Sequence, residues 1–142
     1  MFRTSYIISA TAVSIFALTT PVIAQSPTHT PHMIVVKLVE REGAFKYAFD
    51  PATIEAERGD TLRFVQAANA PHNVRFTKEP EGVKLGRATV GPYLYAMGAK
   101  YDLVLDGRFA DGMYDFVCDP HSMIGMKGTL SIAGAATAAG SK

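Results

Sequence analysis

The chain has 142 residues, and its 14 lysines and arginines nearly balance its 13 aspartates and glutamates. A length of about 100–150 residues is typical of one domain with one core. The sequence contains neither a basic block nor an acidic tail, so it gives no indication of binding to nucleic acid or to a charged membrane surface.

The first 24 residues have the features of a secretory signal peptide. Arg3 provides a positive start, residues 6–18 are apolar, and small residues precede a cleavage site after Ala24. A membrane anchor is the alternative, but the uncharged run is rich in Ser, Thr and Ala and is marginal for a span of about 20 apolar residues. We therefore expect residues 25–142 to be exported to the periplasm as one domain that no longer contacts the membrane.

The lead-in at residues 25–31 is rich in Pro and Thr and is predicted to be flexible. His29 and His32 lie within it or at its edge. A Cu(II) or Ni(II) ion could visit them, but histidines in mobile termini are more often incidental. The sequence alone therefore assigns them no function.

Eight short segments rich in β-forming residues follow, separated by Gly, Pro and Asp turn signals. They lie at residues 32–39, 45–49, 53–57, 61–66, 73–77, 101–105, 113–118 and 127–133. Strands with turn signals every 8–12 residues or so, and almost no helix, predict an all-β protein. The expected architecture is an antiparallel Greek-key β-sandwich without internal repeats or a second domain.

Two further segments have weak patterns. Residues 78–100 are interrupted by Pro and Gly throughout, which predicts an irregular connection with one helical turn near residues 93–97. Residues 134–142 form a low-complexity tail with too little apolar bulk to pack, so we expect it to be flexible.

Cys118 is the only cysteine. In an oxidising compartment cysteines normally pair, so a single exported thiol indicates pairing between chains, catalysis or metal binding. The alternation of the strand at 113–118 places Tyr114, Phe116 and Cys118 on one side, and the aromatic residues indicate that this side faces the core.

Metal binding is favoured by the spacing C-x2-H-x4-M formed by Cys118, His121 and Met126. A thiolate, an imidazole and a thioether suit a copper ion that cycles between Cu(I) and Cu(II), although zinc competes for thiolate and imidazole. The turn at Asp119-Pro120 lets His121 fold back towards Cys118, and Pro120 has no N–H to donate to the sulfur. A fourth donor must come from elsewhere, and His72 is the obvious candidate.

Each donor also has an ordinary structural explanation, since an inward cysteine is usually a core residue and a methionine usually fills a gap. Their joint occurrence favours one shared metal site. The segment CDPHSMIGM at residues 118–126, preceded by Y-x-F-x-C and followed by Lys-Gly, resembles the copper loop of plastocyanin and pseudoazurin. These are small type 1 (blue) copper proteins of the cupredoxin family. Residues 49–65 and 70–74 resemble the same family, and the resemblance extends over about residues 33–132.

The resemblance implies one type 1 copper ion with His72, Cys118 and His121 as near-planar ligands and Met126 as the long axial ligand. Met123 fits the family spacing from His121 less well than Met126 does.

The resemblance also implies roles for the neighbours of the ligands. Asn73 is expected to tie the two copper loops together. The family often has Ser or Thr after the cysteine, whereas this chain has Asp119, followed by Pro120.

Electrons are expected to leave through the edge of His121 within an apolar rim formed by Pro71, Pro120, Met123 and Ile124. A second family route uses a tyrosine just before the cysteine, but this chain has Val117.

The function implied by the resemblance is a periplasmic one-electron carrier, expected to be monomeric. It would dock transiently with redox proteins such as cytochromes or copper or quinone oxidoreductases. A copper-binding or delivery protein would use the same ligands. An oxidase or nitrite reductase would need a second copper centre, for which only His29 and His32 remain, and a cysteine hydrolase would need an oriented histidine–acid pair.

Overall fold

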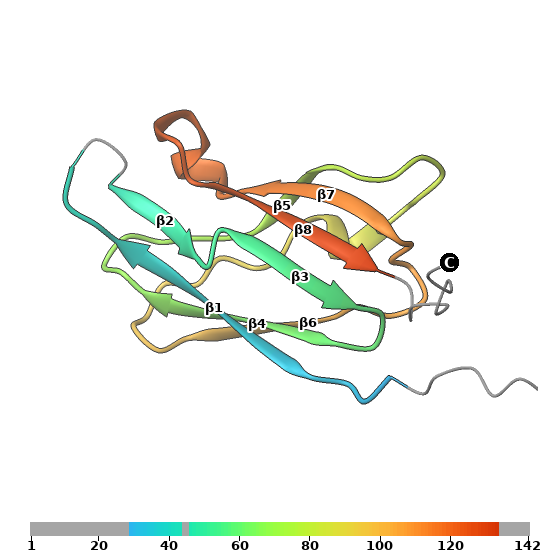
Figure 1. Ribbon diagram of the computed structural model, residues 1–142. Helices are drawn as coiled ribbons and strands as arrows, with labels where there is room; N and C mark the ends of the chain where they lie inside the picture. The colour runs from blue at the N-terminus through green and yellow to red at the C-terminus, as the bar shows by residue number, and fades with distance from the viewer. Residues whose placement is uncertain (1–28, 44–45, 134–142) are drawn as a thin grey trace, which may run out of the picture.

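The computed structural model describes residues 29–43 and 46–133. The predicted signal peptide, most of the lead-in and the predicted flexible tail lie outside these residues. Eight strands form two four-stranded sheets, and Figure 1 shows the strands of both running along the length of the molecule. The first sheet has the order β2 (Tyr47–Asp50), β1 (Met33–Glu40), β4 (Thr61–Ala67), β6 (Lys100–Val104). The second has the order β3 (Thr53–Glu57), β8 (Lys127–Ala133), β7 (Gly112–Val117), β5 (Arg75–Lys78).

The predicted all-β sandwich is confirmed, and each predicted strand overlaps one observed strand. The sheets are mixed, whereas wholly antiparallel pairing was expected. β1 pairs with β4 in parallel, with Val36 opposite Phe64, and β3 pairs with β8 in parallel, with Ile54 opposite Leu130. The chain leaves the first sheet after β2, adds β3 to the second sheet and returns as β4, which brings β4 beside β1 in the same direction. Alternation of polar and apolar residues reports the buried face of a strand but not its neighbour, so it could not indicate these pairings.

The helical turn predicted at residues 93–97 is wrong. Leu94 instead forms a β-bridge with His72, and among residues 29–43 and 46–133 the 3-10 helices lie at η1 (Gly86–Thr89) and η2 (Asp119–Ile124). The backbone of Leu94 is extended there because its N–H donates to the carbonyl of His72 over 2.7 Å. In the part of the chain that the structure describes, no helix is long and apolar enough to cross a membrane.

The core lies between the sheets and contains a cluster of aromatic rings. Phe116 of β7 lies 4.8 Å from Phe49 and 6.3 Å from Phe64, measured between ring centroids, and the edge-to-face angles are typical of favourable aromatic pairs. Gly128 of β8 allows this packing because a Cβ there would lie 2.4 Å from the Phe116 ring. Tyr114, Phe116 and Cys118 are all fully buried, as their alternation predicted.

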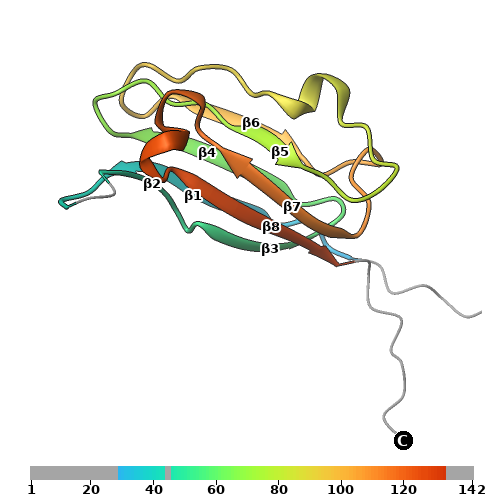
Figure 2. The same cartoon turned by 90° about the horizontal axis from the view of Figure 1, so that it is seen from above.

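The loop after β4 and the loop after β7 lie at the same end of the sandwich. β4 runs towards the loop that contains His72, and β7 runs directly into Cys118 and η2. Figure 2, viewed from above, shows η2 at this end, away from the start of β1. The strand directions alone therefore bring two segments together that are more than 40 residues apart in the sequence.

At the opposite end lies Asp60, which ends the turn between β3 and β4 and is 3% exposed. Its Oδ1 accepts the backbone N–H of His32 over 2.7 Å and contacts His29 Nε2 over 2.7 Å, and its Oδ2 accepts the N–H of Glu57 over 2.9 Å. Burial alone would raise the pKa of Asp60, but these hydrogen bonds outweigh it and hold the pKa below its ordinary value of 3.8. The carboxylate therefore stabilises the fold above that pH, and the contribution is lost as the pH falls through the lowered pKa.

We predict that Asp60→Asn lowers the free energy of unfolding by about 1–3 kcal/mol at pH 7, because an amide nitrogen cannot accept the N–H of Glu57. The deficit should shrink as the pH falls below about 3.8, because the unfolded wild type takes up a proton there and the folded carboxylate follows at its lowered pKa. Urea unfolding at pH 7 and at pH 3 measures both effects. Asp111→Asn is the matched control, because that exposed carboxylate only contacts Arg58 over 3.5 Å and should change stability little. An equal deficit at both pH values would contradict the role assigned to the Asp60 charge.

Candidate metal centre

Three side-chain atoms converge between the two loops at the end of β4 and β7. Cys118 Sγ lies 3.4 Å from His72 Nδ1 and 3.4 Å from His121 Nδ1, and the two nitrogens are 3.1 Å apart. A point equidistant from the three atoms lies roughly 2 Å from each, which is the length of a metal–nitrogen bond. This triangle of one sulfur and two imidazole nitrogens therefore fits a transition-metal ion.

The second loop is built by local hydrogen bonds around η2. The N–H of His121 donates to the carbonyl of Cys118 over 3.1 Å, which folds the imidazole back over the cysteine. Pro120 lies in the first turn of η2, where the missing N–H leaves no helical bond unmade. Gly125 ends η2 with a φ of 93°, a left-handed conformation that glycine adopts without strain. The chain then returns to Met126, whose carbonyl accepts the N–H of Cys118 and whose N–H donates to His121.

The first loop is held by Gln66, which the sequence analysis did not single out. Its Nε2 donates to the carbonyls of Ala70 over 2.6 Å and of Leu94 over 2.9 Å, and the side chain is buried. Leu94 in turn exchanges two backbone hydrogen bonds with His72. The signal that could have identified Gln66 is a polar residue at an inward position of an otherwise apolar strand face.

Asn73 and Asp119 connect the two loops directly. Asn73 Nδ2 donates to Asp119 Oδ2 over 2.7 Å, and the N–H of Asp119 donates back to Asn73 Oδ1 over 2.8 Å. The guanidinium of Arg75, from β5, also donates to the Asp119 carboxylate. Burial would raise the pKa of Asp119, but the hydrogen bonds from Asn73 and Arg75 outweigh it and lower the pKa. An aspartate at this position can therefore form the hydrogen bonds with Asn73 that connect the loops, because Arg75 balances its charge.

Tyr47 of β2 is a second residue that the sequence analysis missed. Its ring centroid lies 5.1 Å from that of His72 and 4.2 Å from that of His121. The ring therefore covers both imidazoles from the side of the first sheet and limits the access of water. The sequence pattern predicts a strand at residues 45–49 but does not indicate that Tyr47 faces two histidines.

Burial keeps the three donors uncharged in the absence of a metal. Burial lowers the pKa of His72 to about 4, assisted by the nearby imidazole of His121, and burial also lowers the pKa of His121. Burial raises the pKa of the Cys118 thiol, although hydrogen bonds from the backbone of Asn73 and His121 oppose the shift. Neutral imidazoles have a lone pair available for a metal ion, and a coordinating thiol gives up its proton when the ion binds.

The two methionines of the loop have opposite environments. Met126 is 0% exposed and packs in the core, whereas Met123 is 98% exposed. Pro71, Pro120 and Ile124 are also exposed, and His121 is half-buried. The structure thus brings Met126 against the backbone of Cys118 and His121, and leaves an apolar surface on the two loops around them.

Comparison with known proteins agrees with this donor set. A family profile described as copper binding proteins, plastocyanin/azurin family, matches residues 29–133. The plastocyanin of Scenedesmus fuscus is 33% identical over 101 residues, which is 70% of this chain and 98% of that protein.

Two solved structures have the same fold. A mutant plastocyanin of fern has a TM-score of 0.57 and 25% identity, covering 70% of this chain and 99% of that one. The pseudoazurin of Methylobacterium extorquens AM1 has a TM-score of 0.52 and 25% identity, covering 71% and 75%. The fold and the cluster of His72, Cys118 and His121 define a cupredoxin with one type 1 copper ion. The chain belongs to the plastocyanin/azurin family of copper-binding proteins.

We predict that Asn73→Ala weakens copper binding by about 10–100-fold, because the tie between the two loops is lost while the donors remain. Competition with a copper chelator measures the affinity. Asn69→Ala, which changes an exposed asparagine of the same loop, is the control and should bind copper like the wild type. Equal affinities for Asn73→Ala and the control would show that the tie does not contribute to metal binding.

Proposed function

We propose that this chain is a one-electron carrier in which His72, Cys118, His121 and Met126 hold a single copper ion. The observation that carries the proposal is the triangle of Cys118 Sγ and the two imidazole Nδ1 atoms, with sides of 3.1–3.4 Å. Membership of the plastocyanin/azurin family supports it. A bound copper ion supplies the one-electron Cu(I)/Cu(II) couple.

The protein contributes a rigid, dry environment for these donors. His72, Cys118 and Met126 are fully buried, so water is kept from most of the site. Hydrogen bonds fix both loops, through Gln66 on one side and through the Asn73–Asp119 pair between them. Donor atoms that are held in place by their neighbours move little when the charge of the site changes, which favours fast electron transfer.

The edge of His121 is the proposed route for electrons. His121 is half-buried, whereas the other three proposed donors are fully buried. An exposed apolar rim lies on the same loops, formed by Pro71, Pro120, Met123 and Ile124. Val117 replaces the aromatic side chain that a route through the strand would use. Small apolar contact surfaces suit short-lived complexes, and we propose cytochromes or copper or quinone oxidoreductases as partners.

We propose that the carrier works in the periplasm as a monomer, after removal of residues 1–24. The features of those residues support export.

A copper-delivery protein is the alternative function. Such a protein must release its ion to an acceptor, which requires accessible donors, whereas three of the four proposed donors here are fully buried. We therefore favour electron transfer without a catalytic role.

The copper-loaded, oxidised protein is predicted to absorb strongly in the visible range, through charge transfer from the Cys118 thiolate to Cu(II). Cys118→Ala should remove this absorption, while Met123→Leu should retain it because Met123 is exposed. Visible and electron-spin-resonance spectra report the metal, its oxidation state and its geometry. A copper-loaded sample that stays colourless would refute the type 1 assignment.

The apolar rim is predicted to control electron exchange. Met123→Lys places like charges opposite each other when two copies meet, so self-exchange between oxidised and reduced protein should slow by at least about tenfold at low salt. Nuclear magnetic resonance line widths of mixed redox samples measure this rate.

Met113→Lys is the matched control, because Met113 is an exposed methionine near the start of β7, away from the copper loops. Its rate should stay within about twofold of the wild type. If both variants slow equally, net charge and not the rim determines the rate.

A further inference from the structure

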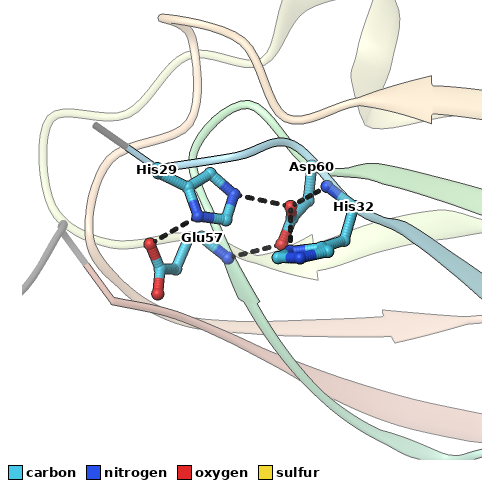
Figure 3. A network of polar contacts seen from close by, with 4 residues as sticks. All are labelled: His29, His32, Glu57 and Asp60. Carbon is cyan, nitrogen blue, oxygen red and sulfur yellow. Dashed lines mark hydrogen bonds and ion pairs between the residues drawn. The ribbon is translucent and has the colours of Figure 1, made fainter. Parts of the chain in front are cut away.

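A second group of metal-binding side chains lies at the end of the sandwich opposite the copper loops. His29 and His32 precede β1, Glu57 ends β3, and Asp60 immediately precedes β4. Figure 3 shows the Asp60 carboxylate between His29 and His32, with the Glu57 carboxylate on the other side of the His29 ring. We propose that His29, His32 and Asp60 bind a divalent transition-metal ion, Cu2+ or Zn2+, with Glu57 orienting His29.

The donor atoms converge on one point. His29 Nε2 lies 2.7 Å from Asp60 Oδ1, and His32 Nδ1 lies 3.7 Å from the same oxygen. All three donor atoms lie within 4.8 Å of one another. An ion about 2.0–2.2 Å from each donor needs separations of this order. The side chain of His32 is 68% exposed, so it is free to adjust its position.

Neighbouring groups already orient the donors. His29 Nδ1 lies 2.8 Å from Glu57 Oε2, and a proton on Nδ1 leaves the lone pair of Nε2 directed at Asp60. Metal-binding histidines commonly donate their other ring N–H to a carboxylate in this way. Backbone N–H groups of His32 and Glu57 fix the two oxygens of Asp60. Without an ion, a proton must lie between Nε2 and Oδ1, and the proposed ion takes its place.

The surroundings leave room for an ion and its water ligands. The four side chains line a surface pocket of about 400 Å³, which Ile34 and Glu55 also border. The pocket lies at the start of β4, whereas the His72 loop follows its end. Seven residues of strand span roughly 23 Å, so the two sites are too far apart to share an ion.

The chemistry of the donors selects the class of ion. Two imidazole nitrogens and one carboxylate suit Cu2+ or Zn2+, while Ca2+ and Mg2+ prefer oxygen alone and Cu(I) prefers sulfur. The competing explanation is structural: a doubly protonated His29 would bridge Glu57 and Asp60 as an ion-pair network that fastens the residues before β1. The two explanations differ in the response to added metal.

The test uses copper-loaded, oxidised protein without a histidine tag. One further equivalent of Cu2+ should give a second electron-spin-resonance signal with tetragonal geometry and nitrogen coupling, and calorimetry should show one Zn2+ bound per chain. His29→Gln should abolish binding, and His32→Gln should weaken it at least tenfold. Glu55→Gln, which removes a charge from the same pocket without removing a donor, should stay within twofold of the wild type.

His32→Gln changes an exposed side chain, so its visible spectrum and melting temperature should match the wild type before metal is added. The proposal is overturned if neither ion binds, or if binding is equal in the wild type, His29→Gln and His32→Gln. The first result would leave the ion-pair network as the role of His29, and the second would place the added metal elsewhere.

Discussion

The copper site depends on one pair of hydrogen bonds, those that Asn73 and Asp119 exchange across 46 positions of sequence. His72 belongs to a loop of the first sheet and Cys118 to a loop of the second, so nothing local keeps them in contact. Asn73 is buried and Asp119 is half-buried, and the hydrogen bonds between them run in both directions and hold the loops at a fixed separation. Packing of Phe116 between the sheets then determines where β7 ends and thus where the sulfur lies.

Asp119, which connects the two loops through Asn73, brings a negative charge close to the metal site. A half-buried carboxylate next to the Cys118 thiol adds negative charge near the site, which would be unfavourable without a partner. Arg75 supplies that partner from β5, so the tie includes a third element of the fold. Burial keeps the donors neutral, and the positive charge of Arg75 balances the negative charge of Asp119. The region thus gains little net charge before a metal binds.

The two ends of the sandwich combine similar side chains in different environments. At the copper loops, Cys118 and His72 are fully buried and Tyr47 packs against both imidazoles, which favours an ion that stays bound and changes its charge. At the start of β1, imidazoles and carboxylates surround an open pocket, which favours an exchangeable divalent ion. Burial and the choice of donor, rather than the number of histidines, distinguish the two sites.

The sequence by itself determined the all-β class, the inward face of β7 and the short-range donor pattern, because spacing within one strand or loop dictates which side chains can meet. It also indicated His72 and Asn73 through the family resemblance. Only the tertiary structure decided the parallel pairings, the anchoring by Gln66, the cover by Tyr47, the partner of Asp119 and the meeting of His29 with Asp60. Each of these joins segments far apart in the chain, and strand alternation specifies a buried face without specifying the neighbour across it.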